Sequence, residues 1–168
     1  MVNSFRKNLL IIMGIFIIFT AHVFAQEDEG GPVEQPEKYA LVIGNSNYTN
    51  LTPLSNPVND ANDIAAVLEY LGFTVDKVLN GNLEQMEDAV IRLRDSLSSV
   101  DNGYGFFFYA GHGVQSGGEN FLIPVNANIP GENFLRNRAM SVQQVLDDLN
   151  DARNGLNVVV HFIKFIYD

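Results

Sequence analysis

The sequence YGFFFYAGHG occupies residues 104–113 and leads from an almost wholly apolar run into a histidine bracketed by glycines. The unbroken apolar run 104–109 predicts a strand buried on both faces of a parallel sheet. Ligands and catalytic groups gather beyond the carboxyl ends of such strands, because the connecting loops converge there. We therefore expect His112 in a loop at the sheet edge, where a catalytic role competes with a structural or surface one.

The two glycines beside His112 indicate what such a loop could do. A glycine has no Cβ, so the backbone can approach a substrate closely. In a loop, the N–H of Gly113 would be free to donate to an oxyanion that develops on a substrate carbonyl. His112 and Gly113 are therefore the candidate catalytic residues.

On either side of this stretch, short apolar runs alternate with segments of helical period. Strands are predicted at 39–43, 73–79, 120–125 and from 157, and helices at 57–71, 83–97 and 142–149. The predicted helix starts are Asn56-Pro57, a capping pair Asn82 and Gln85, and a capping box Ser141 and Gln144. This β-α-β-α-β-α-β order predicts an α/β domain with a mainly parallel sheet covered on both faces.

The beginning of the chain has the features of a targeting segment. Arg6 and Lys7 precede the apolar run 9–19, and Val-Phe-Ala at 23–25 resembles a signal-peptidase site before Gln26. Residues 1–25 are predicted to be a signal peptide, which implies an exported, periplasmic or extracellular protein with no stable membrane association after cleavage. An uncleaved anchor over 9–25 is the alternative, although His22 argues against it. Residues 26–37 are predicted to be an acidic linker, and 38–168 the domain.

The amino-acid composition excludes several classes of function. The 168 residues contain 20 acidic and 10 basic side chains, a net charge of −10 that disfavours nucleic acid and anionic membranes as partners. The chain has no cysteine, which rules out disulfides, thiolate metal sites and thiol nucleophiles within it. After the predicted signal peptide the chain has two histidines, His112 and His161, and no pair of residues has the spacing typical of metal ligands. We therefore expect no intrinsic metal site and no cofactor.

Several segments together resemble a known family. They are Lys38 to Asn45 (KYALVIGN), Asn59-Asp60-Ala61 at a helix start, Leu71-Gly72-Phe73 at its end, and Phe107 to Gly113 (FFYAGHG). In this order they resemble the caspase-like cysteine peptidases, and most of all bacterial metacaspase relatives, over about 38–160. The resemblance implies a three-layer α/β/α sandwich, incomplete at its C-terminal side, with His112 as the catalytic histidine. It also implies a peptide or protein substrate, and it allows a response to calcium.

In the family, this histidine serves a cysteine that follows the neighbouring strand, in a motif of β-branched residues and then Leu-Asp-Ala-Cys. The chain begins this motif at residues 157–160, but without gaps the last four positions hold His161, Phe162, Ile163 and Lys164. The chain therefore has no thiolate with which to attack a peptide carbonyl. A frameshift, a misassembled read or a decayed gene is the hypothesis for the tail 161–168, and nucleotides beyond codon 160 that encode Asp-Ala-Cys would support it.

No other residue is expected to replace the nucleophile. Ser116 lies outside a Gly-x-Ser-x-Gly elbow, and Lys164 occupies the cysteine position only in the alignment. The prediction is a caspase-like endopeptidase domain that is inactive in this form. A pseudopeptidase that binds peptides or partner proteins without cleaving them is the alternative.

Asp60 is the candidate substrate-binding residue. The resemblance implies that an acid in the Asn-Asp-Ala segment can pair with a basic side chain of the substrate. A first-turn aspartate that interacts with the helix dipole is an equal alternative. The family's second pocket aspartate would fall at Phe162.

Overall fold

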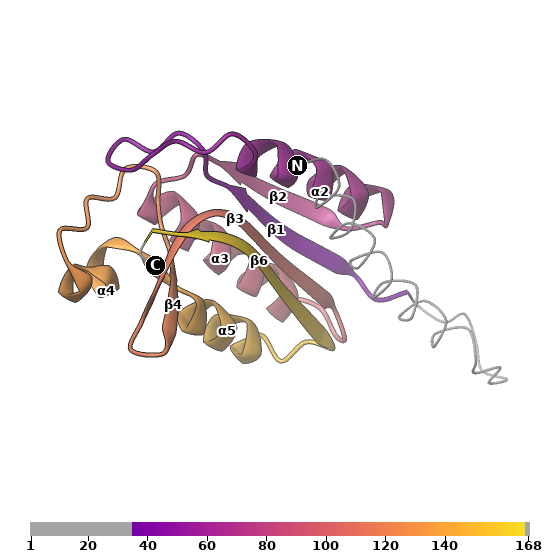
Figure 1. Ribbon diagram of the computed structural model, residues 1–168. Helices are drawn as coiled ribbons and strands as arrows, with labels where there is room; N and C mark the ends of the chain where they lie inside the picture. The colour runs from indigo at the N-terminus through magenta and orange to yellow at the C-terminus, as the bar shows by residue number, and fades with distance from the viewer. Residues whose placement is uncertain (1–34, 167–168) are drawn as a thin grey trace, which may run out of the picture. The chain divides into compact units, whose positions relative to one another are not determined.

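The computed structural model describes residues 35–166, which form one six-stranded sheet flanked by helices (Figure 1). Four strands are parallel, in the spatial order β2 (Thr74–Leu79), β1 (Lys38–Gly44), β3 (Tyr104–Ser116) and β6 (Leu156–Phe165). Two short antiparallel strands, β4 (Glu119–Leu122) and β5 (Met140–Ser141), extend the sheet from the carboxyl half of β3. The predicted mainly parallel sheet is confirmed.

The helices lie on both faces of the sheet. Leu41 and Ile43 of β1 belong to one core cluster with buried residues of α3 (Leu83–Ser98) and α5 (Val142–Asp151). Gly44 points to the opposite face, where a Cβ would stand 2.6 Å from the Cβ of Ala61 in α2 (Pro57–Tyr70). Because alternate residues of a strand face opposite sides, α2 covers one face, and α3 and α5 cover the other. This is the predicted three-layer α/β/α arrangement.

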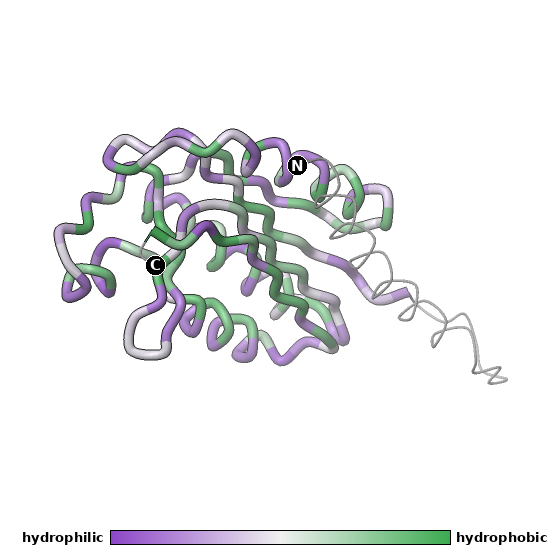
Figure 2. Tube along the Cα trace, in the orientation of Figure 1, coloured by the Kyte–Doolittle hydropathy of each residue, from purple (hydrophilic) through white to green (hydrophobic). Residues whose placement is uncertain are grey.

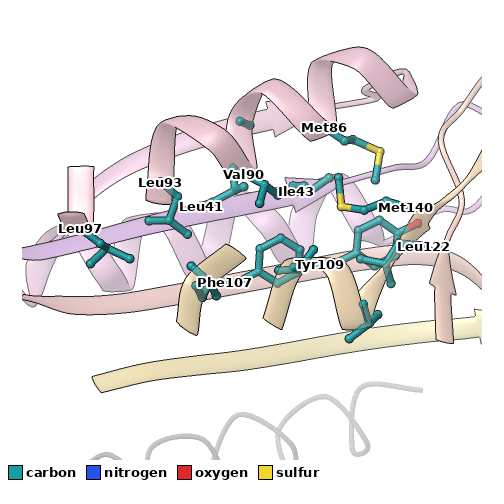
Figure 3. Packing of buried hydrophobic residues seen from close by; sticks show 14 of the residues in the cluster. Leu41, Ile43, Met86, Val90, Leu93, Leu97, Phe107, Tyr109, Leu122 and Met140 are labelled. Carbon is teal, nitrogen blue, oxygen red and sulfur yellow. The ribbon is translucent and has the colours of Figure 1, made fainter. Parts of the chain in front are cut away.

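The larger core lies between the sheet and the pair α3 and α5. Figure 3 shows Met86, Val90, Leu93 and Leu97 of α3 directed at the strands, with Phe107 and Tyr109 of β3 among them. Figure 2 shows the same segregation along the chain, with hydrophobic strands inside and helices that alternate hydrophobic and hydrophilic residues. Each large apolar side chain buried here contributes about 1.5–3 kcal/mol to folding.

The predicted start of α3 is confirmed. Asn82 accepts a hydrogen bond from the N–H of Gln85 at 2.9 Å, and the Gln85 side chain accepts from the N–H of Asn82 at 3.0 Å. This reciprocal pair is the capping box expected from the spacing of the two residues.

The other two helices begin at the predicted N-caps, Asn56 and Ser141, but the side-chain hydrogen bonds there differ from the prediction. Asn56 occupies the N-cap of α2, but its side chain makes no capping bond, and the hydroxyl of Ser46 accepts from the N–H of Val58 instead. Ser141 does accept from the N–H of Gln144, whereas the Gln144 side chain donates to Asp148, one helical turn on. The N-terminus of α2 is thus satisfied from outside the predicted motif, whereas Ser141 caps α5 without the second bond of a capping box.

The strand β3 is longer than predicted. The apolar run indicated residues 104–109, but β3 continues to Ser116, so the prediction of His112 in a loop is wrong. The extension is held on both sides, because β4 pairs with residues 113–116 and β6 pairs up to Gly113. Tertiary pairing thus converts a glycine-rich segment of low strand propensity into strand.

A short helical segment that the sequence pattern does not predict lies between β4 and β5. It consists of a 3-10 turn, Glu132–Phe134, and α4 (Leu135–Arg138). Both are too short to show a full helical period.

None of the helices between residues 35 and 166 combines the length and hydropathy of a bilayer-spanning segment. The predicted signal peptide and residues 26–34 of the predicted linker lie outside the described residues.

Candidate functional site

The imidazole of His112 lies at the carboxyl end of the parallel sheet and is buried, with 3% of the residue exposed. Its Nε2 is 2.8 Å from the carbonyl oxygen of Thr52, in the loop between β1 and α2. Its Nδ1 is 3.2 Å from the carbonyl oxygen of Lys164, on β6. Two backbone carbonyls, from a loop and from the adjacent strand, therefore fix the orientation of the ring.

Both ring nitrogens face carbonyl oxygens, which only accept hydrogen bonds, and a neutral imidazole has one N–H to donate. The shorter contact, to Thr52, favours Nε2 as the donor. With the hydrogen on Nε2, the unprotonated Nδ1 lies on the side of β6, near position 164. An imidazole held this way can accept a proton from an acidic group at that position and can return it to another atom.

Two tyrosines hold the backbone of His112. The hydroxyl of Tyr48 accepts a hydrogen bond from the His112 N–H at 2.7 Å, and its ring lies edge-on to the imidazole with centroids 4.5 Å apart. The hydroxyl of Tyr109 donates to the His112 carbonyl oxygen, also at 2.7 Å. Burial raises the pKa of both phenols, Tyr109 the more, so both hydroxyls stay protonated over the physiological range.

The loop that carries Tyr48 and Thr52 is tied to the sheet edge by Asn45. This amide is buried: its Nδ2 donates to the carbonyl of Ile123, and its Oδ1 accepts from the N–H of Gly81. Its backbone N–H donates to the carbonyl of Ala110, on β3. One asparagine thus connects the ends of β1, β3 and β4 with the turn before α3.

A second apolar cluster lies beneath this loop. Its buried members come from the loop, β3, the β4 region and α4, and are Tyr48, Val114, Phe121, Ile123, Leu135 and Ala139. The cluster gives the loop a packed base, which an unsupported loop of this length would lack.

Gly113 lies inside paired strand, in register with Leu122 of β4 and Phe165 of β6. A Cβ at this position would lie 2.5 Å from Cγ2 of Ile163 and 3.0 Å from the carbonyl oxygen of Phe121. The glycine therefore lets three strands pack closely. The predicted open loop around it is not present, and its role as an oxyanion donor stays a prediction.

The comparison with known families decides the relationship. The model of the caspase domain, a peptidase family, matches residues 37–163. The chain belongs to the caspase domain family. The predicted resemblance to the caspase-like peptidases is confirmed.

Two mammalian relatives agree with this assignment. The human mucosa-associated lymphoid tissue lymphoma translocation protein 1 is 34% identical over 123 residues, which is 73% of this chain and 14% of that protein. Its homolog in Mus musculus is 33% identical over 138 residues, or 82% and 16% of the two chains. The caspase-like domain thus corresponds to a small part of these much longer relatives.

The caspase-like domain brings position 164 to the histidine. His112 and Lys164 are directly paired residues of β3 and β6, and the Lys164 side chain is exposed. The match to the family ends one residue earlier, at Ile163. Position 164, where the sequence analysis expects the family's cysteine, is adjacent to His112 in the sheet.

Asp60 lies in the first turn of α2, at the same sheet edge as His112. Partial burial, and then the charge of Asp63, raise the pKa of its carboxyl. Among residues 35–166, the ion pairs within 4.0 Å do not include Asp60. Its carboxylate is thus half-buried, near another acid and without a cationic partner in the described part.

The other sequence candidates lie away from the imidazole contacts. Ser116, at the end of β3, donates to a carboxylate oxygen of Glu132 at 3.0 Å. Phe162 packs edge-on against Phe108, with ring centroids 5.5 Å apart. No group of three potential metal-ligating side chains occurs in the described residues.

Tyr48, Tyr109 and Thr52 were missed by sequence analysis. Tyr109 was assigned to the core as part of an aromatic strand, and nothing in the sequence links Tyr48 or Thr52 to a residue some 60 positions later. A carbonyl contact such as that of Thr52 carries no side-chain signature at all.

Proposed function

We propose that the carboxyl ends of β3 and β6 form the histidine half of a metacaspase-type cysteine endopeptidase site. The observation that carries this proposal is the direct pairing of His112 with Lys164, the position aligned with the family's cysteine. Directly paired residues of adjacent strands project to the same face, so a thiol at 164 would lie beside the imidazole.

The chemistry follows from the ring orientation. Nδ1 of His112 takes the proton of a thiol at position 164, and the thiolate attacks the peptide carbonyl to form a tetrahedral intermediate. Collapse of this intermediate breaks the C–N bond, and the imidazolium protonates the leaving amine. Water, deprotonated by the imidazole, then attacks the acyl-enzyme, the C–S bond breaks, and the imidazolium returns the proton to the thiolate. The Thr52 carbonyl accepts from Nε2–H throughout and is the third member of the site, with the thiol at position 164 and the imidazole of His112.

The chain itself lacks that thiol and does not hydrolyse peptide bonds at a useful rate. Loss of a protease nucleophile costs on the order of 10⁶ in rate. The lysine at 164 does not substitute, because an amine is a poor nucleophile for amide hydrolysis and position 164 is exposed.

We further propose that Asp60 selects substrates with an arginine or lysine. Its carboxylate lies at the same sheet edge as His112 and has no cationic partner among residues 35–166. A guanidinium or ammonium group would offset the repulsion from Asp63 that helps to raise the pKa of Asp60.

A second candidate is a pseudopeptidase that binds peptides or partner proteins without cleaving them. It is favoured by the absence of cysteine from the chain and by Lys164 in the nucleophile position. Equal affinity for a basic peptide with and without a cysteine at 164, together with no cleavage in either case, would support this candidate.

The proposed site is tested by placing a thiol in it. Because the chain has no cysteine, Lys164→Cys creates a single thiol whose alkylation by iodoacetamide can be followed against pH. We expect this thiol to react at lower pH than an ordinary one, because the imidazole stabilises the thiolate. The matched control is Phe165→Cys, one residue further on β6, which projects to the other face.

Two further measurements complete the experiment, one on a His112 variant and one with a peptide substrate. His112→Gln in the Lys164→Cys background is expected to return the alkylation profile to that of the Phe165→Cys control. Hydrolysis of an arginine-containing fluorogenic peptide by Lys164→Cys, absent in the unmodified chain, would support the peptidase directly. Superimposable alkylation profiles for the thiols at 164 and 165 would refute the site.

Export is a separate proposal. We propose that residues 1–25 direct the chain out of the cytoplasm and are removed before Gln26. N-terminal sequencing of the mature protein tests this, and a protein that retains Arg6 and Lys7 after export would contradict it.

A further inference from the structure

We infer that Tyr48 and Tyr109 are positioning residues of this site, which fix His112 by binding both ends of its backbone. The inference rests on the proposed function, because the orientation of His112 has consequences only if its imidazole acts on a neighbouring group.

The hydroxyl of Tyr48 is placed for two tasks. It accepts from the His112 N–H at 2.7 Å, and its own hydrogen lies within reach of the Tyr109 hydroxyl at 3.2 Å and the Ile123 carbonyl at 3.3 Å. A hydroxyl has one hydrogen and two lone pairs, so these contacts use both its donor and its acceptor capacity. The ring of the same tyrosine packs against the imidazole.

The hydroxyl of Tyr109 completes the arrangement from the other side. It lies 2.7 Å from the His112 carbonyl oxygen and 3.0 Å from that of Ile123, and the residue is fully buried. The N–H of Ile123 donates to the same His112 carbonyl at 3.0 Å. The peptide groups before and after the His112 Cα are therefore each held by a tyrosine hydroxyl.

Packing alone does not account for the two hydroxyls. Phenylalanine would fill nearly the same volume without the cost of burying a polar group. The hydroxyls instead converge on one residue, from positions 61 apart in the sequence. Gly111 leaves room for the two hydroxyls beside His112, because a Cβ at this position would collide with both tyrosine oxygens.

Loss of either hydroxyl should therefore alter the imidazole through the backbone. Without Tyr48 Oη, the His112 N–H is buried and unpaired, and the residue can relax away from the Thr52 carbonyl. The tautomer and the direction of Nδ1 would then no longer be fixed. A change of this kind is measurable in the unmodified chain, whether or not position 164 carries a thiol.

The first test is the ¹⁵N spectrum of the His112 imidazole at mildly alkaline pH, in the full chain. We expect the unmodified protein to hold the Nε2–H tautomer, and Tyr48→Phe and Tyr109→Phe to show a mixture of tautomers. Tyr70→Phe is the matched control, because Tyr70 is 89% exposed on α2. Val90→Ala, in the core on α3, controls for lost stability that does not touch the site.

The second test uses the Lys164→Cys background. We expect Tyr48→Phe and Tyr109→Phe each to lower the alkylation rate of the thiol at position 164 at neutral pH by about fivefold, the factor that corresponds to one net hydrogen bond. Tyr70→Phe and Val90→Ala are expected to leave that rate unchanged.

The two tests separate the inference from the proposed function. A single Nε2–H tautomer in both phenylalanine variants would overturn the inference, whatever the thiol does. Tautomer mixtures in those variants, with an ordinary thiol at position 164, would support the inference and refute the proposed function. An activated thiol that is insensitive to both phenylalanine substitutions would overturn the inference and leave the proposed function standing.

Discussion

His112 and Lys164 are directly paired on the neighbouring parallel strands β3 and β6, and Nδ1 of the histidine lies 3.2 Å from the lysine carbonyl. The register matters because the family motif, aligned without gaps, assigns its cysteine to position 164. Two strand ends that are 52 residues apart in the sequence are thus adjacent at the sheet edge. The backbone thus places position 164 beside His112, as the proposed histidine and cysteine site requires.

Gly113→Ala should destabilise the fold. The added Cβ would lie 2.5 Å from Ile163 and 3.0 Å from the Phe121 carbonyl, so β3, β4 and β6 would have to separate. We expect the free energy of unfolding in urea to fall by about 1–3 kcal/mol. Gly131→Ala is the control, since its nearest contact is an Asn133 side-chain oxygen at 3.2 Å and its φ of −178° suits any residue. Equal stability of the two variants would contradict the prediction.

Asn45→Ala should loosen the loop that carries Tyr48 and Thr52. It leaves the N–H of Gly81 unpaired and removes one donor from the carbonyl of Ile123, which keeps the Tyr109 and Tyr48 hydroxyls. A buried group left unpaired costs about 1–3 kcal/mol, which urea unfolding measures. Asn47→Ala, at an exposed position two residues away, is expected to change stability by less than about 0.5 kcal/mol. A loss no larger than that of the control would show that the asparagine does not tie the loop down.

Asp60→Asn tests whether the carboxylate stabilises the first turn of α2, which is the structural alternative to substrate binding. Its pKa is raised in the fold, so ionisation opposes folding, and the residue's contribution to stability is lost as pH rises through the folded-state pKa. If burial and Asp63 dominate, the amide variant should be slightly more stable at neutral pH, by no more than about 0.5 kcal/mol, and the gain should vanish in acid. If the helix dipole dominates, the variant should be less stable. Thermal unfolding at acidic and neutral pH separates the two.

We expect the exposed edge of the C-terminal strand β6 to cause self-association of the chain. In the described residues β6 pairs only with β3, so its other edge offers ten residues of unpaired backbone, and Phe165 is 48% exposed. Exposed apolar edge strands promote aggregation. We expect oligomers or aggregates of the chain in size-exclusion chromatography at neutral pH, with a smaller share for Phe165→Lys. Elution of the unmodified chain as a monodisperse monomer would contradict this prediction.

Local signals located most of the fold. The apolar runs predicted β1, β2 and β6, and the Asn82 and Gln85 spacing predicted the capping box of α3, because these features depend on residues close together in the chain. The prediction failed where distant partners decide the outcome. Ser46 caps α2 from well before the helix start, and pairing with β4 and β6 turns the predicted His112 loop into strand.

The sequence by itself determined that the chain is an α/β domain of the caspase family with a histidine and no cysteine, because composition, apolar periodicity and short motifs are local properties. Only the tertiary structure decided what surrounds that histidine. The Tyr48 and Tyr109 hydroxyls, the Thr52 carbonyl and the register of Lys164 reach His112 across strands and loops that the chain brings together on folding. Hydrogen bonds act over about 3 Å, and no local pattern records which distant residues will come within that distance.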